Sequence, residues 1–400
     1  MCADEEPGRK FSFRPGWRKD RVLEIASGWQ ETNMNTFFWH VYDGAKQPVR
    51  VLLLLLLLLV SLHTLAEFRD PLDWPADEQS RVAERPTQAV AWAGDKLVAV
   101  GARGLIATST DGIQWDQSNS PVQSDLLAVV FPTPQQGWVV GHDGVILHSS
   151  DGGLSWEKQL DGRLAKDQFS RYYEELSGDP EALESAQAAI GLNYASGPTL
   201  PLLDVWFADA LHGFAVGSFG TLIATRDGGK SWEPWLHRID NEDLLNLNAV
   251  QSVGGTVYIA GERGVVFKLD EQTQRFEQLD TGYDGSFFGI LGVGNSVIAY
   301  GLSGAAYRSD DQGVSWEPLD NSSSVSLTAG VRLAETATFV LLNARGDMLF
   351  GSTDSNRLRF KPGKTFARYT GVVPLGGEKL LMTSLEGIRS EVVQSISAHR

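Results

Sequence analysis

Short apolar runs separated by turn-forming residues fill most of the chain beyond residue 86. Between residues 126 and 160 the runs read LLAVVF, GWVVG, VILHSS and SWEKQL, and the turns between them are rich in proline, glycine and aspartate. The first run is continuously apolar, as expected of a strand that is buried on both faces, and each of the others is long enough for one short strand. The pattern therefore predicts a unit of four antiparallel strands with no helix inside it.

This unit recurs along the chain, and each copy has a Gly-x-x-Gly-like turn between its second and third runs. The last glycines of these turns are Gly104, Gly144, Gly220, Gly264, Gly304, Gly346 and Gly387. The intervals between them are 40, 76, 44, 40, 42 and 41 residues. A period of roughly 40 to 50 residues is typical of a propeller blade with four strands. We therefore predict an all-β fold, a seven-bladed β-propeller.

The long interval contains a segment of a different kind, residues 161–201. Apolar side chains recur there at helical spacing, at Tyr172, Leu176, Leu183, Ala186 and Ile190. The sequence Gly178-Asp179-Pro180 interrupts this pattern. The spacing of apolar residues in this segment predicts a helical insert between blades 2 and 3.

The seventh unit has too few residues after its third run for a fourth strand. Asp73-Trp74-Pro75, ahead of the first blade, is similar to the start of the fourth strand in Ser231-Trp232-Glu233-Pro234. We predict that this N-terminal segment completes the last blade, which would close the ring and remove two sheet edges.

A short phrase between the third and fourth runs is nearly identical in four units: STDGIQW, SSDGGLSW, TRDGGKSW and SDDQGVSW. An aspartate can accept hydrogen bonds from turn amides, and glycine supplies the positive φ of a tight turn. The tryptophan that follows can bury a large apolar area between blades. Because the phrase repeats with the fold, we expect a structural role and no catalytic one for its acids and indoles: Asp111, Trp115, Asp151, Trp156, Asp227, Trp232, Asp311 and Trp316.

The phrase resembles the Asp box, or BNR repeat, of two families. Residues 137–156 and 213–232 are similar to the pattern GxxVGxxGxIxxSxDGGxxW of the photosystem II stability and assembly factors. The resemblance covers roughly residues 86–395. It implies a bacterial relative that is an exported, non-enzymatic scaffold and binds a membrane protein or a complex under assembly. The chain differs from the family in its insert, in its degenerate fourth and sixth Asp boxes and in having no cysteine after its apolar run.

Sialidases also carry Asp boxes, with six blades, an arginine triad, a tyrosine nucleophile and an early Phe-Arg-Ile-Pro motif. This chain has Phe68-Arg69-Asp70-Pro71 instead. A sialidase-like glycoside hydrolase is therefore the alternative function, and it predicts three arginines and a Tyr–Glu pair at the propeller axis. An accessory protein of an exporter is a further alternative.

The Gly-x-x-Gly turns should share one face of the propeller with the insert and the connections between blades, because antiparallel strands alternate in direction. Three of these turns carry an arginine at one equivalent position, which predicts either an anion-binding cluster or ordinary solvated turn residues. The predicted partner-binding residues are Arg103, Arg263, Arg345, His142, Asp143, Phe219, Arg171, Tyr172 and Tyr173.

Charge and the content of cysteine and histidine limit the kinds of ligand and partner that this chain is expected to bind. The net charge of −16 opposes binding to nucleic acid, whose phosphates repel an acidic surface. The single cysteine excludes an internal disulfide, and the 7 histidines lack metal-ligand spacing, so we expect no metal and no cofactor. We expect a monomer.

An apolar run, VLLLLLLLLV, occupies residues 51–60 and continues with interruptions to Ala66. It is shorter than the ~20 residues of a membrane span. Lys46 and Arg50 precede it, and Thr64-Leu65-Ala66 provides a small-residue cleavage site, as in a secretory signal peptide. An uncleaved anchor is the alternative, and Met34 is an alternative start. We predict an N-terminal extension over residues 1–66 and a propeller over 67–400, exported to the periplasm or anchored to the inner membrane facing it.

Overall fold

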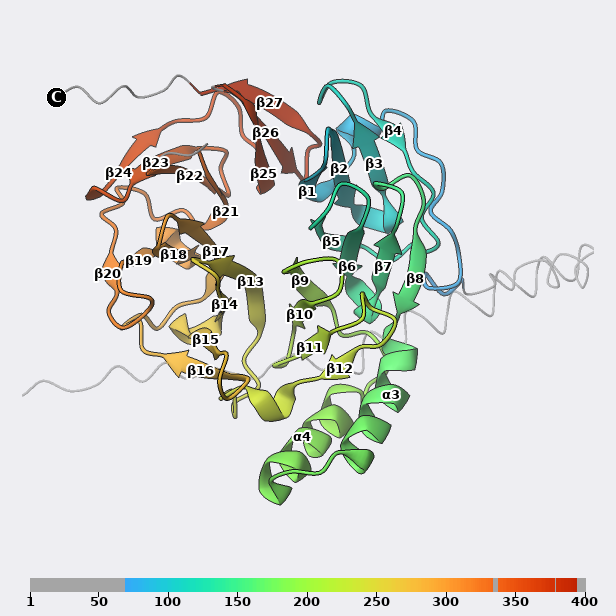
Figure 1. Cartoon of the computed structure of the whole chain (residues 1–400). Coiled ribbons are helices and arrows are strands. Elements are labelled where there is room, and N and C mark those ends of the chain that lie inside the picture. Colours follow the sequence, from blue (N-terminus) through green and yellow to red (C-terminus); the bar gives the residue numbers. More distant parts are fainter. Residues whose placement is uncertain (1–68, 334–336, 378, 394–400) are drawn as a thin grey trace, which may run out of the picture. The chain divides into compact units, whose positions relative to one another are not determined.

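Seven small antiparallel sheets follow one another around a ring in the computed structural model, which describes residues 69–333, 337–377 and 379–393 (Figure 1). Six sheets have four strands and the last has three. We number them blades 1 to 7 in chain order. The seven-bladed β-propeller predicted from the repeat is confirmed. The predicted extension over residues 1–66, with its signal peptide or anchor and the boundary after Ala66, lies outside the described residues.

The strands of each blade run from the centre of the ring to its rim in sequence order (Figure 1). Their bounds are β1 Thr87–Ala93, β2 Lys96–Gly101, β3 Ile106–Ser109 and β4 Asp116–Gln117; β5 Leu126–Val130, β6 Gly137–Gly141, β7 Ile146–Ser149 and β8 Glu157–Leu160; β9 Leu202–Phe207, β10 Gly213–Gly217, β11 Leu222–Thr225 and β12 Glu233–Pro234; β13 Leu247–Val253, β14 Thr256–Gly261, β15 Val266–Asp270 and β16 Arg275–Leu279; β17 Phe287–Val293, β18 Ser296–Gly301, β19 Ala306–Ser309 and β20 Glu317–Pro318; β21 Leu327–Arg332, β22 Thr338–Asn343, β23 Met348–Ser352 and β24 Ser355–Lys361; β25 Tyr369–Gly376, β26 Lys379–Ser384 and β27 Arg389–Val392.

Two α-helices lie between β8 and β9, where the helical insert was predicted: α3 Gly162–Glu175 and α4 Pro180–Asn193. They project outward from the ring beside blades 2 and 3 (Figure 1). The other helical elements of the described residues are short 3-10 turns: Val82–Glu84, Ala102–Gly104, His142–Gly144, Leu236–Arg238, Glu262–Gly264 and Leu302–Gly304. None of the helices in the described ranges has the length and apolar character needed to cross a bilayer.

A bulge near the start of each inner strand helps to join neighbouring blades. Six of the inner strands skip one residue after their first pair with the second strand, and in blade 3 the skip falls at the same place. In three blades the skipped residue donates a side-chain hydrogen bond to the carbonyl of the first residue in the next blade: Asn248 to Phe287 at 2.7 Å, Thr328 to Tyr369 at 2.6 Å and Thr370 to Thr87 at 2.9 Å. Some backbone carbonyls at the inner edges of the sheets, which face the ring centre, thereby gain a hydrogen-bond partner.

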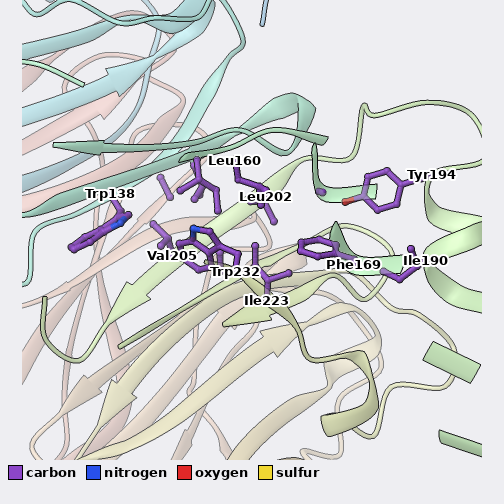
Figure 2. Packing of buried hydrophobic residues seen from close by; sticks show 14 of the residues in the cluster. Trp138, Leu160, Phe169, Ile190, Tyr194, Leu202, Val205, Ile223 and Trp232 are labelled. Carbon is purple, nitrogen blue, oxygen red and sulfur yellow. The ribbon is translucent and has the colours of Figure 1, made fainter. Parts of the chain in front are cut away.

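Apolar side chains fill the space between adjacent blades. Trp138 of blade 2 is fully buried and stacks on Phe207 of blade 3, with ring centroids 3.8 Å apart. The same cluster continues through Leu160 and Trp232 to Phe169 of α3 (Figure 2). Because each sheet packs face to face on its neighbours, each blade depends on both adjacent blades for its core.

The ring closes between blades 7 and 1 through hydrogen bonds, without a shared sheet. Trp92 Nε1 donates to the carbonyl of Pro374 at 2.9 Å, and Thr370 Oγ1 donates to the carbonyl of Thr87 at 2.9 Å. Ile388 N–H donates to the carbonyl of Ala83 at 2.7 Å.

The prediction that residues 73–75 complete blade 7 is wrong. That segment runs instead along the outer side of blade 1, where Ala76 N–H donates to the carbonyl of Ser120 at 3.0 Å. Leu72 is buried between blades 1 and 2, and Arg163 of α3 forms an ion pair with Asp73 at 2.8 Å. Burial of this leucine and attraction to a distant arginine therefore decide the path, while the likeness of Trp74 to a fourth-strand tryptophan does not.

Candidate functional site

The Gly-x-x-Gly turns lie together on one face of the ring. In all seven blades, the residue that opens the turn donates its N–H to the carbonyl just before the first strand of the same blade, at 2.8 to 3.2 Å. This places the turns beside the connections between blades, and we call this side the connection face. The turns between third and fourth strands lie on the opposite side, which we call the Asp-box face.

The third residue of five of these turns has a left-handed backbone. Arg103, Asp143, Phe219, Arg263 and Ser303 have φ between 51° and 58°. This conformation costs a non-glycine residue about 1 kcal/mol or more.

Hydrogen bonds to the next blade hold several of these strained residues in place. Arg103 N–H donates to Asp125 Oδ1 at 2.7 Å, and Phe219 N–H donates to Asn246 Oδ1 at 2.7 Å. Asp125 and Asn246 each precede the first strand of a blade, and their backbone carbonyls accept the N–H of the residue that opens the turn of that blade. Each of them therefore links two blades while it fixes the exposed turn residue.

The three predicted arginines share the connection face but stand in blades 1, 4 and 6. Arg103 lies 3.6 Å from Asp77 and Arg263 lies 2.6 Å from Asp243, and all four side chains are exposed. Exposed pairs of this kind stabilise a fold by only about 0–1 kcal/mol. No two of these blades are adjacent in the ring, so the three arginines form separate points on the connection face.

Arg345 differs from the other two. In its turn Gly346 takes the positive φ, and Asn343 Oδ1 accepts the N–H of Arg345 at 2.9 Å. The side chain borders a pocket of about 260 Å³, which Ser322, Ser323, Ser324, Val325, Asp347 and Phe360 also line. Asp347 is engaged by the side chain of Asn343 at 2.9 Å and by Gly363 N–H at 3.0 Å. Arg345 is therefore the arginine of the three that has no ion pair among the described residues.

The remaining predicted turn residues lie in blades 2 and 3. His142 is exposed, whereas Asp143 is half-buried and accepts a hydrogen bond from Ser124 Oγ at 2.6 Å. Phe219 has 55% of its surface exposed, although its carbonyl accepts a hydrogen bond from Asn193 Nδ2 of α4 at 3.0 Å. The insert therefore contacts the connection face at Phe219.

The three predicted insert residues have different surroundings. Arg171 is exposed, Tyr172 is half-buried, and Tyr173 is buried with 4% of its surface exposed. The Tyr173 hydroxyl accepts Leu236 N–H at 3.1 Å and lies 3.1 Å from His237 Nδ1. Burial raises the pKa of Tyr173. Tyr173 therefore attaches the insert to blade 3 and is not available on the surface.

The base of the insert carries a charged network that the sequence did not reveal. Asp161 is the N-cap of α3, is 2% exposed, and contacts Lys158 at 2.9 Å and Arg163 at 3.1 Å. Burial would raise its pKa, but the hydrogen bonds from Arg163, Lys158 and the backbone of Leu164 outweigh that effect and lower the pKa to about 2. Since Arg163 also binds Asp73, the network holds the N-terminal segment and the insert together.

The repeated aspartates are all engaged in their own turns. Asp151 Oδ1 accepts the N–H groups of Leu154 and Ser155 at 3.0 Å, and Ser149 Oγ donates to it at 2.8 Å. In the box of blade 5, hydrogen bonds from Ser315 and Ser309 lower the pKa of Asp311 to about 2.

The indoles of the boxes pack between blades. Trp156 and Trp232 are buried against the preceding blade, whereas Trp115 and Trp316 are half-buried. The box acids are thus ionised turn residues, arranged to hold the third and fourth strands of a blade together.

The hydrolase alternative predicted three arginines and a Tyr–Glu pair at the axis. Among the described inner strands the one arginine is Arg332, at the end of β21 on the Asp-box face. A closed ring of seven blades, with its repeated acids engaged in turns and its arginines spread over the other face, defines an Asp-box β-propeller.

Comparison with known proteins specifies the family. The chain belongs to the family described as "Photosynthesis system II assembly factor YCF48", whose sequence model matches residues 100–177 and 182–364. A "Photosystem II assembly lipoprotein Ycf48" of Synechococcus sp. (strain CC9902) is 32% identical over 119 residues, which cover 29% of this chain and 34% of that protein. The matched stretch therefore spans about a third of the length of this relative.

Two solved structures have a similar fold over most of this chain. One, "YCF48 bound to D1 peptide", has a TM-score of 0.57 at 15% identity and covers 82% of this chain and 99% of its own. The other, "YCF48 from Cyanidioschyzon merolae", has a TM-score of 0.56 at 14% identity and covers 80% and 99%. The scaffold function expected from the resemblance fits this family, and the glycoside hydrolase does not.

Proposed function

We propose that this protein is an assembly factor that binds a segment of a membrane protein through its connection face. The observation that carries the proposal is the match of the YCF48 family model to the propeller blades. A solved relative is described as bound to a D1 peptide, which supports a membrane-protein segment as the partner. The relative from Synechococcus sp. (strain CC9902) is described as a lipoprotein, which supports an exported, membrane-associated location.

The proposed contact residues are the exposed side chains of the connection face. Arg103, Arg263 and Arg345 provide three cationic points, and Phe219 provides an exposed aromatic surface beside the insert. His142, Asp143, Arg171 and Tyr172 lie on the same face or on the adjoining insert. An extended polypeptide could meet several of these points at once, with carboxylates or carbonyls at the arginines and an apolar side chain at Phe219.

The partner is to be identified by cross-linking the tagged full-length protein in its native membrane, followed by mass spectrometry. Binding of that partner is then measured with the triple variant Arg103→Glu, Arg263→Glu and Arg345→Glu. We expect at least about tenfold weaker binding, since both attraction and charge sign change at the interface.

The matched control makes the same charge change on the Asp-box face. Arg226, Lys230 and Arg332 are exposed there, and their replacement by glutamate should leave partner binding unchanged. Equal partner recovery by both triple variants would contradict the assignment of the connection face. Circular dichroism establishes that both variants are folded.

A further inference from the structure

Blade 7 differs from the other six at its rim. Each of them has a fourth strand, whereas the sheet of blade 7 ends with β27. In the described part of the chain nothing pairs with the outer side of β27, Arg389–Val392, which we call the open edge. The backbone N–H and C=O groups on that side of an edge strand are able to pair with another strand.

One wall of the space beside the open edge is formed by β24 of blade 6. Met348 and Phe350 pack against blade 7, and their cross-strand neighbours on β24 are Lys361 and Arg359. The other face of β24 is turned toward blade 5, where Leu358 is buried. Arg359 and Lys361 therefore line the side toward blade 7. Arg357 precedes Leu358 beyond a register shift between β24 and β23, and its backbone bridges Asp320 after blade 5.

These cations are in excess over the acids around them. Lys361 and Lys364 both reach Glu391, at 3.5 and 3.6 Å. Arg357 and Arg359 are exposed, and within the described residues neither has an ion pair. Residues 355–377 hold five basic residues and no acidic one, in a chain whose net charge is −16.

The excess is specific to this blade. In blades 4 and 5 the residue that pairs with the third strand four positions after the turn glycine is a glutamate, Glu277 or Glu317. In blade 6 Arg359 takes this place, and Lys361 takes the place that Leu279 has in blade 4. The charge of the wall is reversed at the one place where the next blade lacks its outer strand.

The opposite wall is apolar. In blade 2 the outer strand places Leu160 in one cluster with Trp232 of the next blade, and in blade 4 it places Leu279 beside Gly313 of the next Asp box. The described part of blade 7 has no such strand, and Trp115 of blade 1 is left half-buried beside the same small cluster as Ile388. Val392 of the open edge is 58% exposed on the same side as Ile388.

We propose that the open edge is a docking site for an extended segment of a partner protein in which acidic and apolar residues alternate. The segment adds to blade 7 as its fourth strand. Its acidic side chains meet Arg359 and Lys361, and its apolar side chains cover Val392 and Trp115. The seven residues that follow Val393 contain histidine and arginine but no acid, so their charge does not match this wall.

The test uses a short fluorescein-labelled peptide that alternates glutamate with leucine and valine, and fluorescence anisotropy with the full-length chain in mild detergent. Two further peptides are N-methylated at alternate residues, one along each edge. A peptide that pairs as a strand uses one edge only, so one methylated peptide should bind like the parent and the other at least about tenfold more weakly. Loose electrostatic attachment predicts equal binding of the two.

The rim variant, Arg359→Glu with Lys361→Glu, should bind the parent peptide at least about tenfold more weakly. The triple variant of Arg103, Arg263 and Arg345 makes a larger charge change on the connection face and should bind it normally, which separates this site from the proposed function. The proposal is overturned if the parent peptide does not bind, if both methylated peptides bind equally, or if the rim variant binds normally. It is also overturned if binding requires deletion of residues 394–400, because the chain's own tail would then be the occupant.

Discussion

Asp161 allows the strongest quantitative prediction, because its contacts stabilise the base of the insert through charge as well as capping. In Asp161→Asn the side-chain oxygen can still cap α3, since asparagine is as good an N-cap as aspartate. The charge that Lys158 and Arg163 contact is lost. A pKa lowered from 3.8 to about 2 corresponds to about 2 kcal/mol of stability at neutral pH.

The sign of the pH dependence follows from the direction of that shift. A carboxylate whose pKa is lower in the folded state stabilises the fold above its unfolded pKa and loses this contribution as the pH falls through the folded one. The difference between wild type and variant should therefore be constant from about pH 8 to pH 5 and should shrink between about pH 4 and pH 2.

Hydrogen exchange followed by mass spectrometry is the assay, because it reports on α3 separately from the ring. A loss of about 2 kcal/mol speeds the exchange of amides that open with this helix by about thirtyfold. Asp179→Asn is the matched control, since Asp179 caps α4 from an exposed position with one side-chain hydrogen bond of 3.3 Å and, among the described residues, no ion pair. If α3 exchanges at the wild-type rate in Asp161→Asn at pH 7, or if both variants behave alike, the charged network does not hold the insert.

Three further predictions concern single side chains. Tyr173→Phe leaves the N–H of Leu236 without its partner, and urea unfolding should show a loss of about 1–2 kcal/mol with unchanged partner binding. Burial raises the pKa of Asp204 to about 7, so ionisation of this carboxyl destabilises the fold as the pH rises from about 4 to 7. Asp204→Asn should flatten the dependence of the melting temperature on pH in that range. An unaltered slope would contradict this. Gly104→Ala places a methyl group against a backbone carbonyl at a positive φ and should cost more than about 3 kcal/mol, whereas Gly255→Ala, with a positive φ and open space, should cost about 1–2 kcal/mol in the same thermal melts.

The repeated blades could be predicted because their signals are local. Turn glycines, apolar runs and the box phrase each act within about ten residues, as hairpin geometry requires. The insert was also predictable from its helical period. The burial of Tyr173 was not recognised, although Phe169 lies four residues earlier and marks the same buried side of α3.

The features that could not be predicted depend on contacts between distant parts of the chain. Arg163 and Asp73 are 90 residues apart, and nothing near either one reveals the pair. The pairing of Arg103 and Arg263 with Asp77 and Asp243 is of the same kind, because the acids come from connections that show no repeat. A sequence pattern therefore located the arginines on one face but could not show that two of them are already neutralised.

The clamp on the N-terminal segment determines how the molecule would respond to traction. A pull on the chain from before Arg69 is first resisted by the ion pair of Asp73 with Arg163 and by the bond from Lys158 Nζ to the carbonyl of Leu72, at 2.9 Å. It next meets the pairing of Ala76 with Ser120, and only afterwards the first strand of the ring. The contacts of the N-terminal segment would therefore break before the propeller opens. The segment would lengthen while the ring, with its closure between blades 7 and 1, keeps its shape.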